Sequence, residues 1–553
     1  NPNHSLLLFL QLSHLCCLSI YNKGKSEKVG FFAARITSPT VLPSAPLPTR
    51  SNYSNPNYST QKFNDMCDLP IIDPWDESMK PFLMDQPREK DPTENCDRAW
   101  RPYTELVDGV WNVTQEKEGR SCKARCFTPT GLNTQIKKSD WFPAGPTDCE
   151  FLEAACWEYG RQVYGYLHTQ IRPHPLPTPP TNDSPDVFVF LVDSMSSGIM
   201  KRSLRKTVEF MTEKMGAIDF PFLNQVAIRS QPNAIPLWFG KQTEAGTLQG
   251  GKQIKVDWTE EYYCNKYLDD EPNIFSDFLN AGYTTNYIDD WSSQCLTSNP
   301  YCKGFQNYHS THTFYHFTKI LDYYSTPLTR KHLKGDKLCR EIHLAALEFF
   351  EQFARAYSDR PKFVWSWSVH LAHGFLTVPH RYRDNGILEV LKTNAGRLQS
   401  QYDVRATILD ILKYQPASQF GDRNLLEIPD ERGHSLIRQQ PETPRNCETL
   451  PIIQQYCICK SKPVDMRNDT TLSDRLATGL INYVHDTLDR LNVTSLCHKY
   501  EFEQVTLLER FSSNSTASYR IIVKTKQPAV FETVVTDNET TGNLEFGEME
   551  RLD

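Results

Sequence analysis

The stretch VFVFLVDSMS, residues 187–196, decides the fold of this chain. Its first six residues are all apolar, which is typical of a strand covered on both faces in a parallel sheet. Asp193 follows directly, where such a strand ends. Ligand sites of doubly wound sheets lie beyond the carboxyl ends of the strands, so Asp193 is a candidate metal ligand. The alternative is that Asp193 or Ser194 caps the following turn.

Around this strand, short apolar runs alternate with amphipathic stretches. A helix is predicted next, because four apolar residues recur at helical spacing: Leu204, Val208, Met211 and Met215. Further strands are predicted to end at residues 287–288 and 367–369, and further helices near residues 344–357 and 403–412. The alternation predicts an α/β core over residues 185–440, built around a largely parallel, doubly wound sheet.

Segments of different composition flank this core. Six cysteines lie in residues 62–170, which predicts a disulfide-containing N-terminal appendage. Residues 171–184 are rich in proline and predict a stiff, extended linker. Residues 441–553 contain four cysteines and a β-like stretch, and predict a C-terminal appendage. Residues 29–61, rich in Ser, Pro and Asn, have no helical or strand period and are interpreted as a stalk.

An apolar run, SLLLFLQLSHLCCLSI, occupies residues 5–20 near the start of the sequence. It has the length of a signal peptide, and Gln11 and His14 make it a poor membrane span. We therefore expect residues 1–28 to be a cleaved signal peptide. The alternatives are a type II membrane anchor and, third, a segment of the folded core.

Composition points to the secretory pathway and away from nucleic acid. The 553 residues carry a net charge of −7, and their lysines and arginines form no basic stripe, so nucleic acid is excluded as a partner. Fourteen of the 16 cysteines follow the leader. The sequence has no Cys-x-x-Cys pair, so the cysteines do not indicate a zinc site. Eight glycosylation sequons also lie after the leader, at Asn52, Asn57, Asn112, Asn182, Asn468, Asn492, Asn514 and Asn538. Together they predict a disulfide-bonded glycoprotein that is secreted or luminal.

Three further motifs place polar residues where a site would form. Ser230, two residues before Pro232, begins a predicted helix, whose N-terminus would stabilise a nucleophilic alkoxide and the anion it attacks. Asp289 and Asp290 follow one predicted strand, and His370 and His373 follow another. Each motif also has an ordinary structural interpretation: an N-cap for the serine, a turn for the acids and buried hydrogen-bonding histidines.

The order of these motifs, from DSMS through SQPNAIPLWFGK, GYTTNYIDDW, WSWSVHLAHG and YDVRATILDIL to CETLPIIQQYCIC, resembles the animal family called domain of unknown function 229. That family is similar to the sulfatases of the alkaline phosphatase superfamily. The resemblance implies a metal-dependent hydrolase of small or glycan-borne phosphate or sulfate esters. It also implies roles for individual residues, with Ser230 as nucleophile, His373 as a catalytic histidine, and Asp193, Ser230, Asp289 and Asp290 at the metal, zinc or calcium.

Two departures from the family pattern bear on activity. Ala234 stands where sulfatases carry the arginine of their formylglycine motif, so an unmodified Ser230 is expected. More seriously, the family's strand ending in Ser-Asp-His-Gly is absent, and only 28 residues separate His373 from Tyr402. Asp384-Asn385-Gly386 is rejected as a substitute because it follows no buried strand. We expect that one core strand region is deleted and that the metal site is incomplete.

Two functions remain open. The chain is either a version of a phospho- or sulfo-ester hydrolase that is inactive as it stands, with an active longer form, or a non-catalytic pseudoenzyme. The pseudoenzyme would bind anionic esters or glycans. A membrane contact is expected only through the N-terminal anchor alternative.

Overall fold

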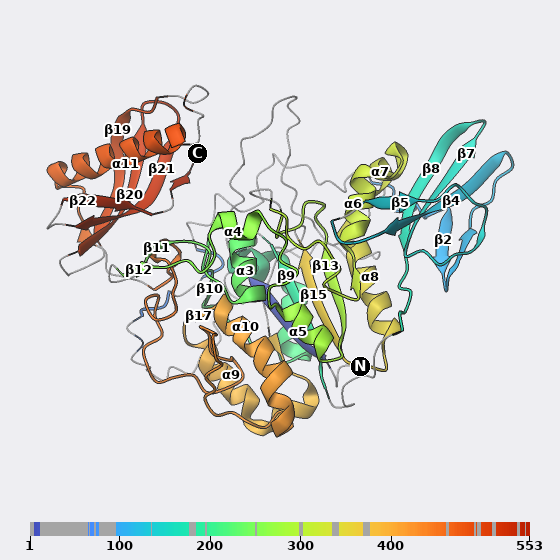
Figure 1. Cartoon of the computed structure of the whole chain (residues 1–553), viewed down its shortest axis with the longest axis horizontal. Helices are drawn as coiled ribbons and strands as arrows, with labels where there is room; N and C mark the ends of the chain where they lie inside the picture. Colours follow the sequence, from blue (N-terminus) through green and yellow to red (C-terminus); the bar gives the residue numbers. More distant parts are fainter. Residues whose placement is uncertain are drawn as a thin grey trace.

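The structure is a computed structural model of the 553-residue chain (Figure 1). It describes residues 5–11, 65, 67–70, 73–76, 96–133, 135–175, 184–193, 196–248, 252–297, 302–334, 342–368, 376–459, 464–490, 494, 499–510, 516–538, 542–547 and 549–552.

A six-stranded sheet forms the centre of the molecule, with strand order β14-β13-β15-β9-β1-β16. The strands are β14 (His312–Thr313), β13 (Thr284–Asp289), β15 (Lys362–Ser368), β9 (Asp186–Val192), β1 (Ser5–Gln11) and β16 (Leu376–Thr377). All neighbouring pairs are parallel except β1 and β16, which are antiparallel. The predicted α/β class with a largely parallel sheet is confirmed in this form.

Both faces of the sheet are covered, as the apolar run of β9 predicted. Val187, Val189 and Leu191 face one core, which also contains residues of α3 (Ser230–Phe239), α5 (Ile274–Asn280) and α10 (Gln401–Leu409). Phe188 faces a second core with α6 (Tyr315–Tyr323) and α8 (Ile342–Ala356). Alternation along the strand therefore sends side chains into two separate layers.

The helix predicted from Leu204 to Met215 forms as several short helices. They are α1 (Ser197–Ser203), α2 (Arg205–Glu209) and the π-helix η3 (Phe210–Lys214). The four apolar residues still share one small core with Met200 and Ala217. The strands and the other helices predicted in the core lie where the sequence placed them, within a few residues.

Residues 5–11 of the apolar leader form β1, which pairs in parallel with β9 along its whole length, from Ser5 opposite Asp186 to Gln11 opposite Val192. This pairing corresponds to the third alternative for the leader. It does not test cleavage, so the signal peptide or anchor stays a prediction. Among the helices that the structure describes, none is long and apolar enough to cross a membrane.

The N-terminal appendage is a β structure. Its larger sheet has the order β5-β4-β7-β8, comprising β5 (Ile136–Lys138), β4 (Arg120–Pro129), β7 (Phe151–Glu158) and β8 (Arg161–Thr169). A smaller sheet contains β2 (Thr104–Val107), β3 (Val110–Val113) and β6 (Gly145–Pro146). Aromatic residues of the larger sheet share the second core with α6 and α8, so this appendage packs on the central domain.

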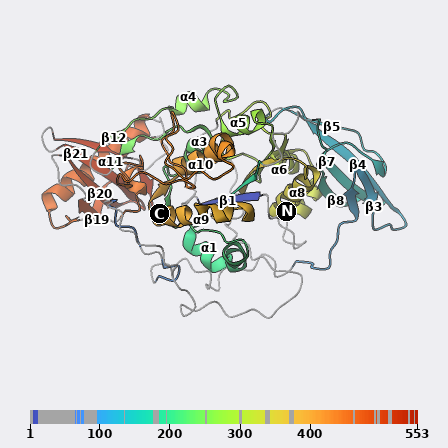
Figure 2. The same cartoon turned by 90° about the horizontal axis from the view of Figure 1, so that it is seen from below.

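The C-terminal appendage packs one long helix, α11 (Thr470–Arg490), on an antiparallel sheet. The sheet contains β18 (Val464–Asp465), β19 (Phe502–Arg510), β20 (Thr516–Thr525), β21 (Val530–Asn538), β22 (Asn543–Phe546) and β23 (Glu550–Arg551). It has a core of its own. Figure 2 shows this unit and the N-terminal sheet at opposite ends of the molecule, with the central domain between them.

Disulfides form, as predicted for a chain rich in cysteine, and one of them joins segments far apart in the sequence. Two of them lie within the N-terminal appendage, and Cys67 is bonded to Cys459 in the C-terminal region across 392 residues. The pairs with both cysteines among the described residues are Cys67–Cys459, Cys122–Cys156, Cys126–Cys149, Cys264–Cys302 and Cys447–Cys457. Among the described cysteines, Cys295 alone is free.

Candidate functional site

The carboxyl ends of three parallel strands meet at one edge of the central sheet. Asp289, the last residue of β13, is in register with Trp367 of β15, and Ser368 is in register with Val192 of β9. The residues that follow each strand are therefore neighbours. Backbone hydrogen bonds extend the pairing beyond the strands: the Asp193 N–H donates to the Ser368 carbonyl (2.9 Å).

Asp193 and Ser230 lie together at this edge. The Ser230 hydroxyl donates to Asp193 Oδ2 at 2.7 Å, and the Trp367 indole N–H donates to the same oxygen at 3.1 Å. Asp193 and Ser230 are partly exposed, whereas Trp367 is fully buried. The sequence predicted both residues separately, and the structure brings them into contact. A hydroxyl held against a carboxylate in this way is arranged as a nucleophile beside its base.

Ser230 is the first residue of α3, a helix whose start has no side-chain cap. The first N–H groups of a helix lack partners within the helix, and the helix dipole adds positive potential there. Arg229 immediately precedes the helix, and its buried Nε has no hydrogen-bond partner among the described residues. These features make the start of α3 suited to an anion.

Asp289 and Asp290 are also at this edge, but Asp289 is committed to its own loop. Its Oδ2 accepts from the Tyr287 hydroxyl (2.7 Å) and the Cys295 N–H (3.1 Å), and its Oδ1 accepts from the Trp291 N–H (3.0 Å). Burial raises the pKa of Asp289 to about 7, against the hydrogen bonds that lower it. The turn interpretation therefore describes the contacts of Asp289. Asp290 is buried beside it, with its N–H 3.4 Å from the Trp367 carbonyl.

The described residues at this edge do not fit a metal ion by themselves. Two groups in the described part of the chain bring three metal-ligating atoms close together, and neither contains Asp193, Asp289 or Asp290. His370 and His373 lie outside the described residues, so their part in the site stays a prediction. The assignment of Asp193, Ser230, Asp289 and Asp290 as metal ligands likewise stays a prediction.

Asn385 and Gly386 lie inside a π-helix, η6 (Arg383–Ile387), and not at a strand end. The Asn385 side chain donates to the Phe420 carbonyl (2.6 Å) and accepts from Arg423 (3.1 Å). This placement agrees with the rejection of Asp384-Asn385-Gly386 as a substitute ligand set. Between β16 and β17 (Gln399–Ser400), the described residues form only helices and turns, including α9 (Leu388–Ala395).

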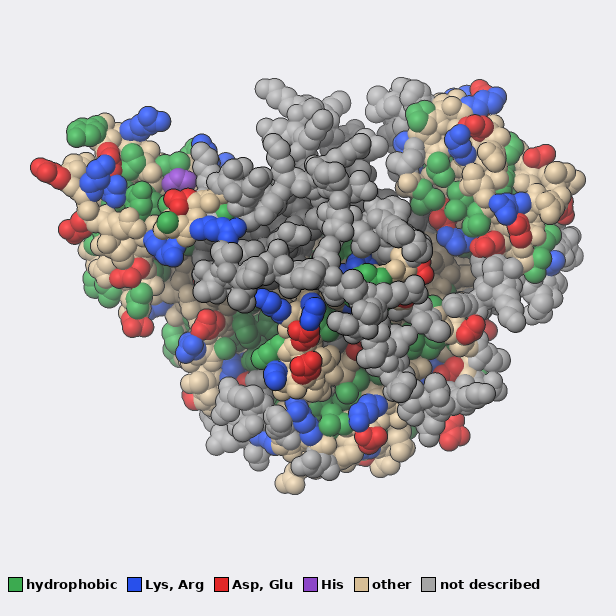
Figure 3. All heavy atoms as spheres, turned by 180° about the vertical axis from the view of Figure 1, so that it is seen from behind, with side chains coloured by type: hydrophobic (Ala, Val, Ile, Leu, Met, Phe, Trp, Pro, Cys, Tyr) green, Lys and Arg blue, Asp and Glu red, His purple; other side chains and the backbone are tan. Residues whose placement is uncertain are grey.

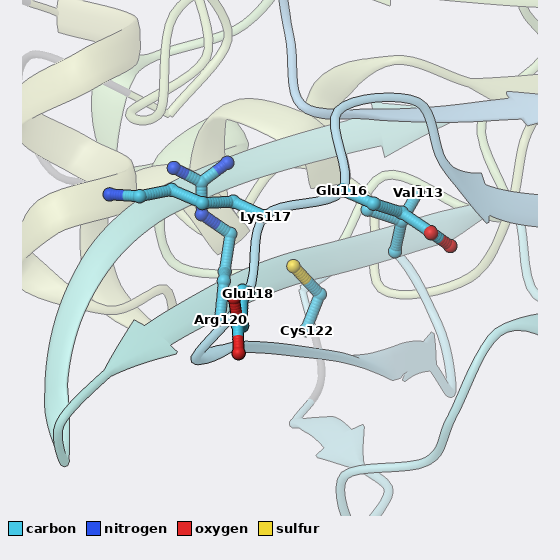
Figure 4. Close-up of a pocket in the computed structure, with 6 residues that line it drawn as sticks. All are labelled: Val113, Glu116, Lys117, Glu118, Arg120 and Cys122. Carbon is cyan, nitrogen blue, oxygen red and sulfur yellow. The ribbon is translucent and has the colours of Figure 1, made fainter.

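A pocket of about 390 Å³ lies far from this edge, in the N-terminal appendage (Figure 4). Val113, Glu116, Lys117, Glu118, Arg120 and Cys122 line it. Its cations are largely neutralised: Glu158 pairs with Lys117 at 2.9 Å and with Arg120 at 2.8 Å, which lowers the pKa of Glu158. Its one thiol, Cys122, is bonded to Cys156, so this pocket is a weaker candidate than the carboxyl-end edge, where a serine hydroxyl contacts a carboxylate.

The described surface has no strongly charged region on the face shown in Figure 3, where acidic and basic side chains are intermixed. This distribution agrees with the absence of a basic stripe in the sequence. A site for an anion is therefore expected to depend on local groups, such as those at the start of α3, rather than on the field of the whole molecule.

The fold and this edge define the chain as a mixed α/β protein with a parallel central sheet, disulfide-linked appendages and a Ser-Asp pair at the strand ends. The model of one family, described as a protein of unknown function (DUF229), matches residues 89–392 and 375–506. The chain belongs to this family. No curated protein and no solved structure matches the chain.

Sequence reasoning missed two side chains of the site. Trp367 was noted only as part of a strand end, since nothing in a sequence tells that an indole N–H will reach a carboxylate on the next strand. Arg229 directly precedes the motif around Ser230, and the motif itself gives it no role. Its position, directly before a helix start that carries a candidate nucleophile, was the available signal.

Proposed function

We propose that this chain is a secreted, sulfatase-like member of the alkaline phosphatase superfamily that binds phosphate or sulfate esters at the start of α3. Its complete form would hydrolyse them, whereas this chain would bind without turnover. The observation that carries the proposal is the 2.7 Å hydrogen bond from Ser230 to Asp193 at the carboxyl edge of the sheet. Ligands of open α/β sheets bind at this edge.

The chemistry follows from the groups present. In the complete form, Ser230 Oγ would bond to the phosphorus or sulfur atom while the bond to the ester oxygen breaks, and Asp193 would accept the serine proton. The released ester oxygen would leave as an alcohol after taking a proton from water. Hydrolysis of the seryl ester by water would then regenerate the serine. The N–H groups of α3 and the Arg229 guanidinium would hold the anionic oxygens. In that form, a divalent ion, zinc or calcium, would supply further charge stabilisation.

The architecture of the central sheet supports the absence of turnover in this chain. The family's strand ending in Asp-His-Gly would precede α10, yet the described residues between β16 and α10 provide no long strand. The position beside β9 is filled by residues 5–11. The two family-model matches also meet at residues 375–392, inside the interval where the strand is absent. All three observations support a deleted segment at this point.

A non-catalytic role is the second candidate. The same edge would then be a binding surface for an anionic ester or glycan. The deletion would be present in every form of the protein. The buried hydrogen bonds of Asp289 favour this candidate, because a carboxylate committed to a loop is poorly placed to bind a metal ion.

Secretion is part of the same proposal. The five described disulfides are typical of an oxidising compartment, and two sequon asparagines, Asn112 and Asn468, are exposed. Expression through a eukaryotic secretory pathway, followed by glycosidase digestion, tests this. A mass that does not change on digestion would contradict it.

Sequencing transcripts across the codons for residues 386–392 separates the two candidates. The hydrolase proposal predicts a longer transcript that encodes an apolar strand followed by Asp-His-Gly. The encoded protein should hydrolyse an aryl phosphate or aryl sulfate, and Ser230→Ala should abolish this activity. Ser358→Ala is a matched control, because Ser358 is an exposed residue in the turn before β15. If every transcript joins these residues directly, the non-catalytic candidate is favoured.

A further inference from the structure

A group of three metal-ligating residues lies away from the carboxyl-end edge, where the N-terminal appendage meets the central sheet. Glu150 directly precedes β7, His174 follows β8 in the proline-rich linker, and His312 begins β14. Two strands, β13 and β15, separate β14 from β9 and its Asp193. One ligand atom from each of the three residues lies within 4.8 Å of the other two.

The contact between Glu150 and His312 is unusual for two paired side chains. His312 Nδ1 lies 2.8 Å from Glu150 Oε1, yet this buried nitrogen has no hydrogen bond of acceptable geometry. The carboxylate is close to the ring nitrogen but out of line with an N–H bond. The side chain of His312 is fully buried, so bulk solvent does not reach this nitrogen.

His174 completes the group from the exposed side. Its ring stacks on that of His312, with centroids 5.0 Å apart and planes 19° from parallel. The backbone N–H of His174 donates to the Tyr357 hydroxyl at 3.0 Å, which holds the linker against the end of α8. The exposed side chain of His174 leaves one side of the group open to solvent.

We propose that Glu150, His174 and His312 bind one divalent transition-metal ion, zinc by preference. Two imidazoles and one carboxylate form a ligand set that zinc accepts, with a water in the fourth position. Ligand atoms of a tetrahedral zinc lie about 3.4 Å apart. Glu150 Oε1 and His312 Nδ1, at 2.8 Å, would therefore move slightly apart to admit the ion, while His174, within 4.8 Å of both, would need at most a small approach. A cation bound between His312 Nδ1 and the Glu150 carboxylate would also give Nδ1 the partner that it lacks.

Tyr357 would support this ion without touching it. His312 Nε2 lies 2.8 Å from the Tyr357 hydroxyl. If Nε2–H donates to the hydroxyl oxygen, the lone pair of the ring is on Nδ1, the nitrogen that faces Glu150. Metal-bound histidines usually donate their other ring N–H to such a partner, which fixes the tautomer. Tyr357 is therefore a positioning residue for the metal and not a ligand.

The ion would link three parts of the chain. Glu150 belongs to the N-terminal appendage, His174 to the linker and His312 to the central sheet, so one ion would hold the appendage and linker to the domain. Binding to the folded state alone raises stability with ligand concentration. The other group of ligating atoms, Cys447, Cys457 and Cys459, is excluded as a metal site because all three sulfurs are in disulfides.

Titration of zinc chloride into the EDTA-treated, full-length chain tests the proposal, with bound metal counted by elemental analysis after gel filtration. We expect one equivalent of zinc and a higher melting temperature on binding. His174→Ala and Glu150→Gln should weaken zinc binding about 10-fold or more, and Tyr357→Phe about 10-fold. His434→Ala is the matched control, because His434 also pairs with a glutamate, Glu427, but has no third ligand.

The proposal is overturned if the wild-type chain binds no zinc, or if His174→Ala and Glu150→Gln bind it as the wild type does. His174 is exposed, so its replacement is expected to leave the fold intact, and circular dichroism checks this. Asp193→Ala separates the two sites. An ion lost in Asp193→Ala and kept in His174→Ala would belong to the carboxyl-end edge, and would refute the site at Glu150.

Discussion

His309 offers the sharpest test of the packing described for the core. The ring is buried among three aromatic side chains, at centroid distances of 4.3 Å to Phe305, 4.6 Å to Phe275 and 4.9 Å to Tyr287. Neither ring nitrogen has a hydrogen-bond partner among the described residues. Burial alone lowers the pKa of His309 from 6.5 to about 3, since the charged form would lose its hydration.

This lowered pKa links stability to pH with a definite sign. Because the unfolded chain binds a proton at His309 that the folded chain does not, this contribution is fully present above pH 6.5. It is lost as the pH falls towards about 3. Between pH 7 and pH 5 the loss amounts to about 2 kcal/mol. His309→Phe removes the ionisable group and keeps an aromatic ring in the aromatic cluster.

The assay is denaturant unfolding followed by tryptophan fluorescence at pH 7 and pH 5. We expect the wild type to lose about 2 kcal/mol more than His309→Phe between the two values. His434→Ala, a change at a less buried histidine, should lose as much as the wild type. Equal losses in the wild type and His309→Phe would refute the burial of this ring as a neutral group.

Three further predictions follow from the same structure. Burial raises the pKa of Asp289 to about 7, so its contribution to stability falls as the pH rises from about 4 to 7. Asp289→Asn should remove this dependence, as the difference between the two pH profiles of unfolding will show. Trp238 packs edge-to-face on Trp365 and Trp367 at 5.7 and 6.0 Å, so Trp238→Ala should destabilise the core by about 3 to 5 kcal/mol in denaturant unfolding. The Cys67–Cys459 bond closes the longest described disulfide loop, so replacing both cysteines by serine should cost up to about 5 kcal/mol, measured as a lower melting temperature.

Much of the fold could be predicted from local patterns. The uniformly apolar run of β9 required cover on both faces, and alternating strands and helices then required parallel neighbours. The partner of β9 on its other side could not be predicted in this way. The leader was assigned by its length and apolar character, and such a run fits a buried strand equally well, because periodicity does not separate the two.

Part of the candidate site could also be predicted from local patterns. Asp193 was identified by its position at a strand end, and Ser230 by its position at the start of a predicted helix. The loop contacts of Asp289 depend on the fold of residues 290–295, which no spacing in the sequence specifies. The group of Glu150, His174 and His312 was also missed, because its members are 24 and 138 residues apart and meet only when the appendage packs on the sheet.

The most direct test of the central claim is calorimetric titration of phenyl phosphate and phenyl sulfate into the purified chain. We predict saturable binding of at least one of them, weakened about 10-fold or more by Arg229→Gln, which removes one charge-assisted contact. Ser358→Ala should bind as the wild type does. Undetectable binding of both esters, or equal affinity in the wild type and Arg229→Gln, would contradict an anion site at the start of α3.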